Sequence, residues 1–313
     1  MNSNLSGYTR GETPSPDSGS RAVPGAPLRR DAGHLCVIDG SNMLHRAWAM
    51  ARHRTRADGL DIAAADLFAR MMHKLLRRML SGRYPPSHVA VFFDPPRGES
   101  WRRRIYPDYK IDRPDTDPGL VAQTPLMRSA CECMGVSSAV APRHEADDLI
   151  AAYVEDAAAT GARCSIVSTD KDLMQLVRPR VLQLSPVREE WYDRDRVRRK
   201  FGVCPDRLAD FLALSGDRCD GIPGAPGIGP VSACRILSDF GSLGAVLRNP
   251  EALAKPAWRR AVSENMEMIQ LSRVLVSLDH EAAPRLLSEE DMRAPDIRRV
   301  IDGVRAWRND NLS

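Results

Sequence analysis

Three short apolar runs, each leading into an aspartate, constrain the fold of this chain more than any other feature of its sequence. The runs and their acids are 35–38 with Asp39, 89–93 with Asp94, and 164–168 with Asp170. Continuous apolar runs of this length are typical of strands that are buried on both faces of a parallel sheet. We therefore expect three parallel strands whose carboxyl ends carry acidic side chains.

Helical patterns separate the predicted strands. Residues 62–80, 120–134 and 145–159 place apolar side chains at the three- and four-residue spacing of amphipathic helices. This alternation predicts an α/β fold, with a mostly parallel central sheet flanked by helices.

The character of the sequence changes on both sides of this region. The first 33 residues are rich in Gly, Pro and Ser, which predicts a disordered tail. After residue 194 helical patterns dominate, and a Gly/Pro-rich turn lies at 223–230. The predicted division is a tail at 1–33, an α/β domain at 34–194, a helical subdomain at 195–300 and a C-terminal tail at 301–313.

The sequence has no feature typical of a membrane or secreted protein. Its apolar runs are far shorter than the roughly 20 residues of a transmembrane helix, and no signal-peptide pattern is present. The seven cysteines are scattered and never spaced as Cys-x-x-Cys, which argues against a zinc site and a disulfide framework. We therefore expect reduced thiols and a cytoplasmic location.

Acidic side chains recur at equivalent places of the predicted fold. In open α/β sheets ligands bind outside the carboxyl ends of the strands, so acids that follow different strands converge there. Taken singly, each acid has an ordinary explanation, such as complementing a helix dipole or shaping a turn. The nine candidates are Asp39, Asp94, Glu145, Asp147, Asp148, Asp170, Asp172, Asp217 and Asp220.

Converging carboxylates require cations, because like charges at close range repel and raise one another's pKa. Mg²⁺ prefers oxygen ligands, so a cluster of carboxylates without His or Cys is typical of a magnesium site. Two such ions can stabilise the attacking and the leaving oxygens of a phosphoryl transfer. The sequence contains no Walker A loop, which argues against an NTPase.

The net charge of +4 conceals an asymmetry. Setting the nine acids aside removes nine negative charges, so the remaining residues carry +13. An acidic pocket in an otherwise basic protein suits an enzyme that binds a polyanion together with metal cations. A basic and aromatic segment at 101–113 fits such a partner, because cations pair with phosphates and rings stack on bases. A solvated helix face is the alternative explanation of this segment.

Seven stretches together resemble the bacterial and phage 5′–3′ exonuclease and flap endonuclease family, and most closely the 5′-nuclease domain of bacterial DNA polymerase I. They occur in the family's order and cover roughly residues 35–290. The stretches are VIDGSNMLHRA (37–47), VFFD (91–94), YPDYK (106–110), EADD (145–148), STDKDL (168–173), GDRCDGIPG (216–224) and GIGP (227–230). The resemblance implies a PIN-like 5′-nuclease fold with a helix-hairpin-helix subdomain. Because no polymerase domain follows, we expect a free-standing nuclease.

The resemblance also implies two metal ions, Mg²⁺ with Mn²⁺ as a substitute. Residues assigned to the first ion by their motif positions are Asp39, Asp94, Glu145, Asp147 and Asp148. Residues assigned to the second ion, partly through water, are Asp170, Asp172, Asp217 and Asp220. Since every acid of the motifs is present, an active nuclease is expected.

The DNA contacts follow from the same resemblance. Residues 97–120 would form an arch over the site, in which Lys110 contacts the scissile phosphate and Arg104 is a second candidate for that task. The turn at 227–230 would hold a DNA phosphate and a K⁺ ion. The further candidates for DNA contact are Arg46, Arg102, Arg103, Arg113, Gly227, Ile228, Gly229 and Ser232.

Two positions depart from the family pattern. Val231 stands where members often carry a lysine, so one phosphate contact is expected to be missing. His45 stands where members often carry a tyrosine, which leaves stacking to His45 or Trp48 unless Trp48 belongs to the core.

The predicted function is magnesium-dependent hydrolysis of DNA near 5′ ends and 5′ flaps, by a monomer that acts in replication and repair. RNA primers are a further candidate substrate, and a polymerase and a ligase are candidate functional partners. The alternatives are a junction-binding protein with weak catalysis, a PIN-like ribonuclease and a phosphatase. The complete acid set, the helix-hairpin-helix turn and the basic segment argue against these three in turn.

Overall fold

A six-stranded sheet forms the centre of the computed structural model, which describes residues 33–51, 61–96 and 98–312. The predicted disordered tail lies outside the described residues, apart from Gly33. The strand order is β3-β2-β1-β4-β5-β6, and only the β5–β6 pair is antiparallel. The strands are β1 (His34–Asp39), β2 (His88–Phe93), β3 (Ser137–Val140), β4 (Arg163–Val167), β5 (Val181–Ser185) and β6 (Glu190–Tyr192).

β1 is the switch point of the sheet, because successive strands are added first on one side of it and then on the other. The strands that follow it first, β2 and β3, lie on one side, whereas β4 and β5 lie on the other. In α/β sheets a ligand crevice forms at such a switch point, outside the carboxyl ends of the strands. Asp39 is the last residue of β1 and therefore stands where a ligand site is expected.

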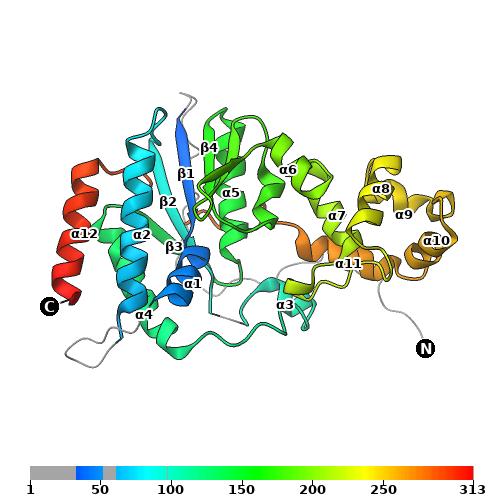
Figure 1. Ribbon diagram of the computed structural model, residues 1–313, viewed down its shortest axis with the longest axis horizontal. Helices are drawn as coiled ribbons and strands as arrows, with labels where there is room; N and C mark the ends of the chain where they lie inside the picture. The colour runs from blue at the N-terminus through cyan, green and yellow to red at the C-terminus, as the bar shows by residue number, and fades with distance from the viewer. Residues whose placement is uncertain (1–32, 52–60, 97, 313) are drawn as a thin grey trace, which may run out of the picture.

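Helices cover both faces of the sheet (Figure 1). One face carries α1 (Gly40–Met50), α2 (Ala63–Leu80), α4 (Pro118–Cys133) and α12 (Ile297–Leu312), and the other carries α5 (Ala146–Ala159). Successive side chains of a strand point to opposite faces. Cys36 and Ile38 accordingly join the core under α1 and α2, while Leu35 and Val37 join the core under α5. The predicted α/β fold class is confirmed.

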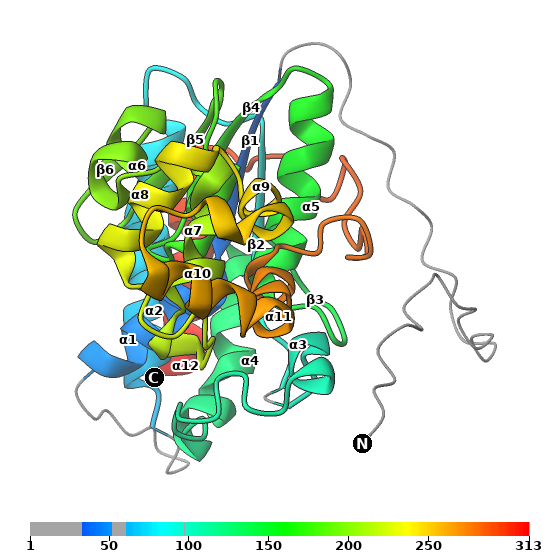
Figure 2. The same ribbon diagram turned by 90° about the vertical axis from the view of Figure 1, so that its right-hand side faces the viewer.

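A helical subdomain with its own core lies beside the β6 edge of the sheet and faces the viewer in Figure 2. Its core includes Phe211, Trp258 and Ile269, and it also takes in Tyr109 from the basic segment. The elements are α6 (Arg194–Phe201), η2 (Pro205–Arg207), α7 (Leu208–Ser215), η3 (Arg218–Asp220), α8 (Pro230–Phe240), α9 (Leu243–Arg248), η4 (Pro250–Ala252), α10 (Pro256–Ser263) and α11 (Met266–Val276), where η marks a 3-10 helix.

The predicted C-terminal tail at 301–313 is wrong, because this segment forms most of α12. Val300, Val304 and Trp307 share one face of that helix and are buried in the core against α2 and α4. Trp307 is 1% exposed, and its indole Nε1 donates a hydrogen bond to Ser129 Oγ at 2.9 Å. The helical subdomain also ends with α11, near residue 276 rather than 300.

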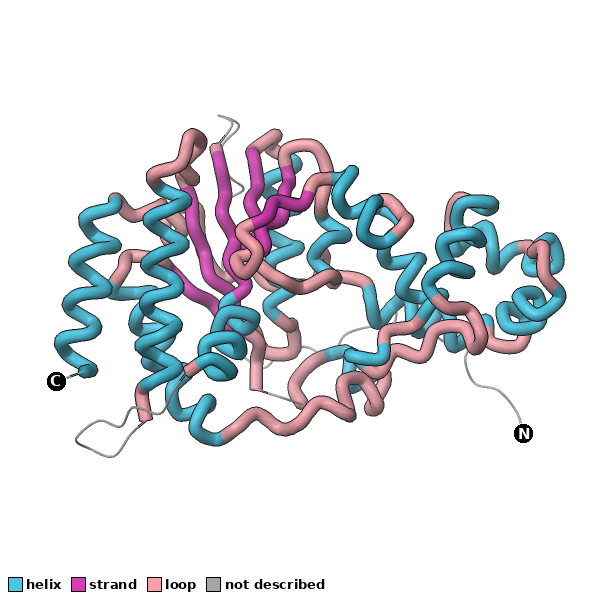
Figure 3. The backbone as a smooth tube through the Cα atoms, in the orientation of Figure 1, coloured by secondary structure: helices cyan, strands magenta, loops and turns pink. Residues whose placement is uncertain are grey.

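The basic segment connects the two parts of the molecule. It begins with the short helix α3 (Trp101–Ile105) and continues as an irregular stretch to the start of α4. This stretch passes below the carboxyl ends of the strands in the view of Figure 3. None of the helices described has the length and apolar character needed to cross a bilayer.

Candidate active site

The acids at the carboxyl ends of β1 and β2 are held at the starts of two helices. Asp39 caps α1, since its Oδ1 accepts the Asn42 N–H at 2.8 Å and its Oδ2 accepts the Ser168 hydroxyl at 2.7 Å. Asp94 Oδ1 accepts the Ala146 N–H at 2.7 Å, at the start of α5. These bonds fix the orientation of both carboxylates, joining Asp39 to the end of β4 and Asp94 to the start of α5.

Glu145, directly before α5, accepts hydrogen bonds from side chains of the basic segment. Its Oε1 accepts from Lys110 Nζ at 2.9 Å, and its Oε2 accepts from Tyr109 Oη and Arg102 Nη1, each at 3.0 Å. Burial would raise the pKa of Glu145, but the charges of Lys110 and Arg102 outweigh burial and lower it. Glu145 is therefore a charged carboxylate in direct contact with the lysine predicted to act in catalysis.

Four acids at strand ends and at a helix start raise one another's pKa, which shows that they lie close together. Burial raises the pKa of Asp39 to about 7, with Asp94 and Asp170 adding to the shift against the hydrogen bonds from Asn42 and Ser168. Burial and then the charges of Asp170, Asp39 and Asp94 raise the pKa of Asp147 well above its ordinary range. Such shifts require short separations between the carboxylates. We define the first carboxylate cluster as Asp39, Asp94, Glu145, Asp147 and Asp170.

A second carboxylate cluster consists of Asp172, Asp217 and Asp220, which can each place an oxygen within 4.8 Å of the others. Burial and then Asp170 raise the pKa of Asp172 to about 8. Its Oδ1 is buried and has no hydrogen-bond partner among the described residues. A buried carboxylate oxygen without a donor, beside other carboxylates, is the environment that a hard cation satisfies. An all-oxygen donor set of this kind is typical of sites for hard divalent cations.

Basic side chains balance part of this negative charge. Lys171 Nζ lies 2.6 Å from Asp217 Oδ2, and Arg113 forms an ion pair with Asp220. Arg113 was expected to contact DNA, whereas Lys171 was not selected from the sequence. The position of Lys171 between Asp170 and Asp172 was the available signal, because a cation there has acids on both sides.

Replacing Asp172 by asparagine is expected to stabilise the protein when no divalent metal is present. The pKa of Asp172 in the folded chain, about 8, exceeds its ordinary value of 3.8. The folded state therefore binds this proton more tightly than the unfolded chain, and the contribution of Asp172 to stability falls as pH rises from about 3.8 to about 8. The gain in the free energy of unfolding for Asp172→Asn should consequently be larger at pH 8 than at about pH 5.5.

Urea unfolding in EDTA at the two pH values measures this gain. The exposed Asp310, replaced in the same way, is the control for the substitution itself. A gain that stays constant between the two pH values would contradict a strongly raised pKa at Asp172.

Two family models together match nearly all of the described chain. The first, "5′-3′ exonuclease, N-terminal resolvase-like domain", matches residues 34–202. The second, "5′-3′ exonuclease, C-terminal SAM fold", matches residues 203–299. The chain belongs to the 5′–3′ exonuclease family. This membership confirms the resemblance found in the sequence, and it places this chain among nucleases that act on DNA.

Individual relatives agree with this assignment. The chain is 34% identical to the 5′-3′ exonuclease of Aquifex aeolicus, over 85% of this chain and 89% of that protein. It is also 34% identical to the flap endonuclease Xni of Cronobacter sakazakii, over 78% of this chain and 92% of that protein. The match to DNA polymerase I of Rhizobium leguminosarum, at 37% identity, covers 83% of this chain but only 26% of the polymerase.

Solved structures share the fold of this exonuclease family member. The T5 D15 protein crystallised with metal ions aligns with a TM-score of 0.67 at 18% identity, over 88% of this chain and 99% of that chain. The T5 D15 flap endonuclease in a complex with DNA and metal ions aligns with a TM-score of 0.63 at 19% identity, over 89% and 98%. The predicted PIN-like architecture with an added helical subdomain is therefore confirmed as a fold.

Asp148 does not take the role of metal ligand predicted for it in this exonuclease. Its Oδ1 accepts from Arg102 Nη2 at 2.7 Å and from the Asp279 N–H at 2.9 Å. Its Oδ2 accepts from Arg102 Nη1 at 2.9 Å, Trp101 Nε1 at 3.0 Å and the Glu145 N–H at 3.2 Å. With five donors on its two oxygens, Asp148 has no lone pair left for a metal.

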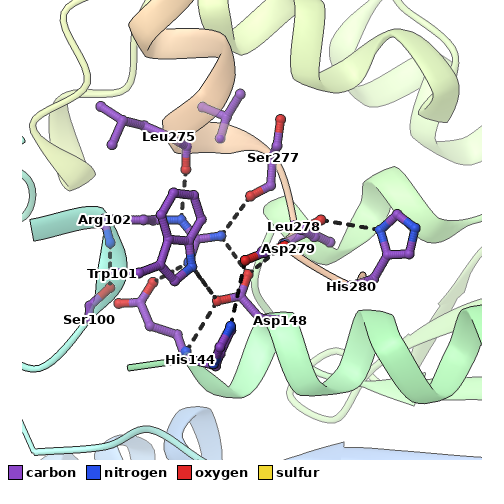
Figure 4. A network of polar contacts seen from close by, with 12 residues as sticks. Ser100, Trp101, Arg102, His144, Asp148, Leu275, Ser277, Leu278, Asp279 and His280 are labelled. Carbon is purple, nitrogen blue, oxygen red and sulfur yellow. Dashed lines mark hydrogen bonds and ion pairs between the residues drawn. The ribbon is translucent and has the colours of Figure 1, made fainter. Parts of the chain in front are cut away.

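The prediction that Arg102 contacts DNA is also wrong. Arg102 is only 3% exposed, and its remaining donors reach the carbonyl oxygens of Leu275 at 2.8 Å and Ser277 at 2.7 Å (Figure 4). Arg102 and Asp148 thus join α3, the start of α5 and the end of α11. A count of basic residues cannot separate a buried arginine from its exposed neighbours, which is why the sequence did not reveal this.

The other predicted DNA contacts lie on accessible parts of the exonuclease. Arg104 is exposed on α3, while Arg103 on α3 and Arg46 on α1 are partly exposed. In the turn before α8, added side-chain atoms at Gly227 and Gly229 would meet nothing within 4 Å, so the backbone is open to a ligand. Ser232, in the first turn of α8, is partly exposed.

The positions of three further residues show how their predicted roles in DNA binding should be restated. The side chain of Ile228 belongs to the helical-subdomain core, so only its backbone can face DNA. Val231 is 85% exposed and leaves a surface position where a lysine would project. Trp48 packs against the main core and beside Gly119, which favours the core role over stacking on a base.

Proposed function

We propose that this chain hydrolyses DNA phosphodiester bonds next to a 5′ end or a 5′ flap, with two divalent metal ions. The observation that carries the proposal is the convergence of eight carboxylates, from five separate stretches of sequence, at the carboxyl end of one sheet. Family membership supports the same reaction class.

The two clusters are the proposed sites of the two ions, Mg²⁺ under physiological conditions with Mn²⁺ as a substitute. When bound, the ions would supply charge stabilisation for the attacking and leaving oxygens of the phosphoryl transfer. Asp39, Asp94, Glu145 and Asp147 would hold the first ion, and Asp172, Asp217 and Asp220 would hold the second. Asp170 raises the pKa of members of both clusters, so we place it between the two ions.

Lys110 is the proposed partner of the scissile phosphate. Its ammonium already lies in the first cluster, and the charges of Glu145, Asp220 and Asp94 help to raise its pKa above the usual range despite burial. It therefore stays protonated at every physiological pH and can neutralise phosphoryl oxygens as their charge grows. The exposed Arg104 is the second candidate for this task.

Replacing Lys110 by alanine is expected to reduce the single-turnover rate of cleavage by about 10²–10³-fold. The reason is that Lys110 Nζ lies 2.9 Å from Glu145 Oε1 in the first carboxylate cluster, whereas Arg102, the other cation on Glu145, is paired with the buried Asp148. Arg104→Ala is the matched comparison and should change the rate by much less. Equal losses in the two variants would remove the special role given to Lys110.

The helical subdomain is the proposed clamp for duplex DNA. We propose that the open backbone around Gly227, Ile228 and Gly229, with Ser232, holds a phosphate, and that carbonyl groups of the turn hold K⁺. Arg46, Arg103 and Arg113 would add phosphate contacts nearer to the carboxylates.

The wider setting is also a proposal. We infer a monomer that acts in the cytoplasm during replication and repair, alongside a polymerase and a ligase, with RNA primers as a second substrate. All seven cysteines are free thiols, which suits a reducing compartment.

Cleavage of a 5′-labelled flap duplex tests the proposed function. Mg²⁺ should yield products with a 5′-phosphate and a 3′-hydroxyl, cut at or near the junction, and EDTA should abolish them. An RNA flap on the same duplex measures the preference between the two nucleic acids. Tight DNA binding without cleavage in Mg²⁺ or Mn²⁺ would favour the junction-binding alternative instead.

A further inference from the structure

A groove of about 960 Å³ lies between α2 and α12, at the end of the molecule away from α8, α9 and α10 (Figure 1). None of the eight carboxylates proposed as metal ligands lines it. The α2 side presents Arg70, His73 and Arg77, which follow one another at three- and four-residue steps. Each helix therefore contributes one continuous face to the groove.

Four arginines give the groove a positive charge that the described chain balances only in part. They are Arg70, Arg77, Arg305 and Arg308. The buried Asp66 is shared between two of them, at 3.3 Å from Arg70 and 2.9 Å from Arg308. Among the described residues, no acid forms an ion pair with Arg77.

The remaining ion pair in the groove is a weak one. Arg305 lies 3.8 Å from Asp302, and the two side chains are 74% and 75% exposed. A pair so exposed contributes little, because water screens both charges. The groove therefore keeps a surplus of guanidinium groups that is available to an anionic ligand.

His73 supplies a polar group that lacks a partner. Its ring Nε2 is buried and makes no hydrogen bond within the part of the chain that the structure describes. A buried polar atom without a partner is costly, and a ligand that bonds to it recovers that cost.

The groove also has an apolar side. Ile301, Val304 and Leu312 of α12 line it together with the arginines. A nucleic-acid backbone would pair with the arginines but would offer nothing to these three side chains. A peptide that carries both carboxylates and apolar side chains would satisfy both parts of the surface, in the manner of a helix laid into a groove.

We propose that this groove binds an acidic, partly apolar peptide segment of another protein. The N-terminal 32 residues of the chain itself are a poor candidate, because they hold four arginines against three acids. The partner would be recognised by aspartates or glutamates opposite Arg77 and Arg305 and by apolar side chains opposite Ile301 and Leu312, which are partly exposed. Because the groove lies apart from the carboxylate clusters, such a partner could remain bound during cleavage.

Fluorescence anisotropy with a labelled peptide of three Glu-Glu-Leu-Leu repeats tests the proposal on the full chain. The groove variant carries Arg77→Glu and Arg305→Glu. The matched control carries Arg78→Glu and Arg298→Glu, on the same two helices but outside the groove. We expect the groove variant to bind at least about tenfold more weakly, and the control to stay within about twofold of the wild type.

Two further measurements complete the test. A peptide with lysine in place of glutamate should not bind, and both variants should cleave the flap duplex at the wild-type rate. The proposal is overturned if the wild type fails to bind the acidic peptide or if the groove variant binds it equally well. It is also overturned if the groove substitutions weaken binding of flapped DNA, or abolish self-association of the chain, while leaving peptide affinity unchanged.

Discussion

Replacing Asp170 by asparagine should slow flap cleavage about a thousandfold and leave DNA affinity nearly unchanged. Asp170 acts on both carboxylate clusters, since its charge raises the pKa of Asp147 and of Asp172. The substitution preserves shape, and the amide oxygen can still accept the Asp172 N–H, which now lies 2.8 Å from Asp170 Oδ1. Loss of the charge would weaken both ions, and several kcal/mol of lost transition-state stabilisation corresponds to about 10³ in rate.

Single-turnover kinetics with saturating enzyme measure this effect without interference from product release. Asp310→Asn, on the exposed side of α12, is the control and should cleave at the wild-type rate. A wild-type rate for Asp170→Asn at saturating Mg²⁺ would mean that Asp170 does not hold the metals.

Replacing Arg102 by methionine should lower the free energy of unfolding by about 3–5 kcal/mol. Arg102 and Asp148 are both buried, and they contact each other through two hydrogen bonds of 2.7 and 2.9 Å. Removing the guanidinium leaves Asp148 with an uncompensated charge in the interior, which costs more than the pair itself contributes. The carbonyl groups of Leu275 and Ser277 would lose their donors as well (Figure 4).

A double variant separates the cost of the unpaired Asp148 charge from the cost of the carbonyl groups that lose their donors. Arg102→Met combined with Asp148→Leu removes both charges of the pair and should recover part of the stability, because Asp148 no longer carries an uncompensated buried charge. Urea unfolding measures both variants, and Arg104→Met on the same helix is the exposed control. A double variant less stable than Arg102→Met alone would contradict the ion-pair explanation.

The centre of the fold was predictable from sequence because its strands are buried on both faces. The runs at β1 and β2 are apolar throughout, the run at β4 is interrupted only by the buried Ser165, and these strands lie inside the sheet. The missed strands include both edges, β3 and β6. Each has only a few residues, and they include Ser137, Ser138 and Glu190, since an edge strand contacts fewer neighbours and tolerates polar side chains.

The C-terminal helix was missed for a different reason. Its buried face consists of Val300, Val304 and Trp307. Charged and polar residues separate these three, so the segment was predicted as a tail from its overall polar composition. Helical spacing of the three apolar residues was the usable signal.

The convergence of the acids was predictable, but the role of each acid was not. Strand ends meet at one edge of a parallel sheet, and this placed Asp39, Asp94 and Asp170 together. Asp147 and Asp148 are neighbours in the EADD motif, yet side chains one position apart on a helix point about 100° apart. One of them consequently faces the carboxylates while the other faces Arg102. Only three-dimensional structure distinguishes the two.

The most direct test of the two-metal site is anomalous diffraction from crystals of the full chain soaked in Mn²⁺. The account predicts two peaks, one beside Asp39, Asp94 and Asp147 and the other beside Asp172, Asp217 and Asp220, with Asp148 bound to neither. Absence of manganese from both clusters at saturating concentration, in protein that is active in Mn²⁺, would contradict the account.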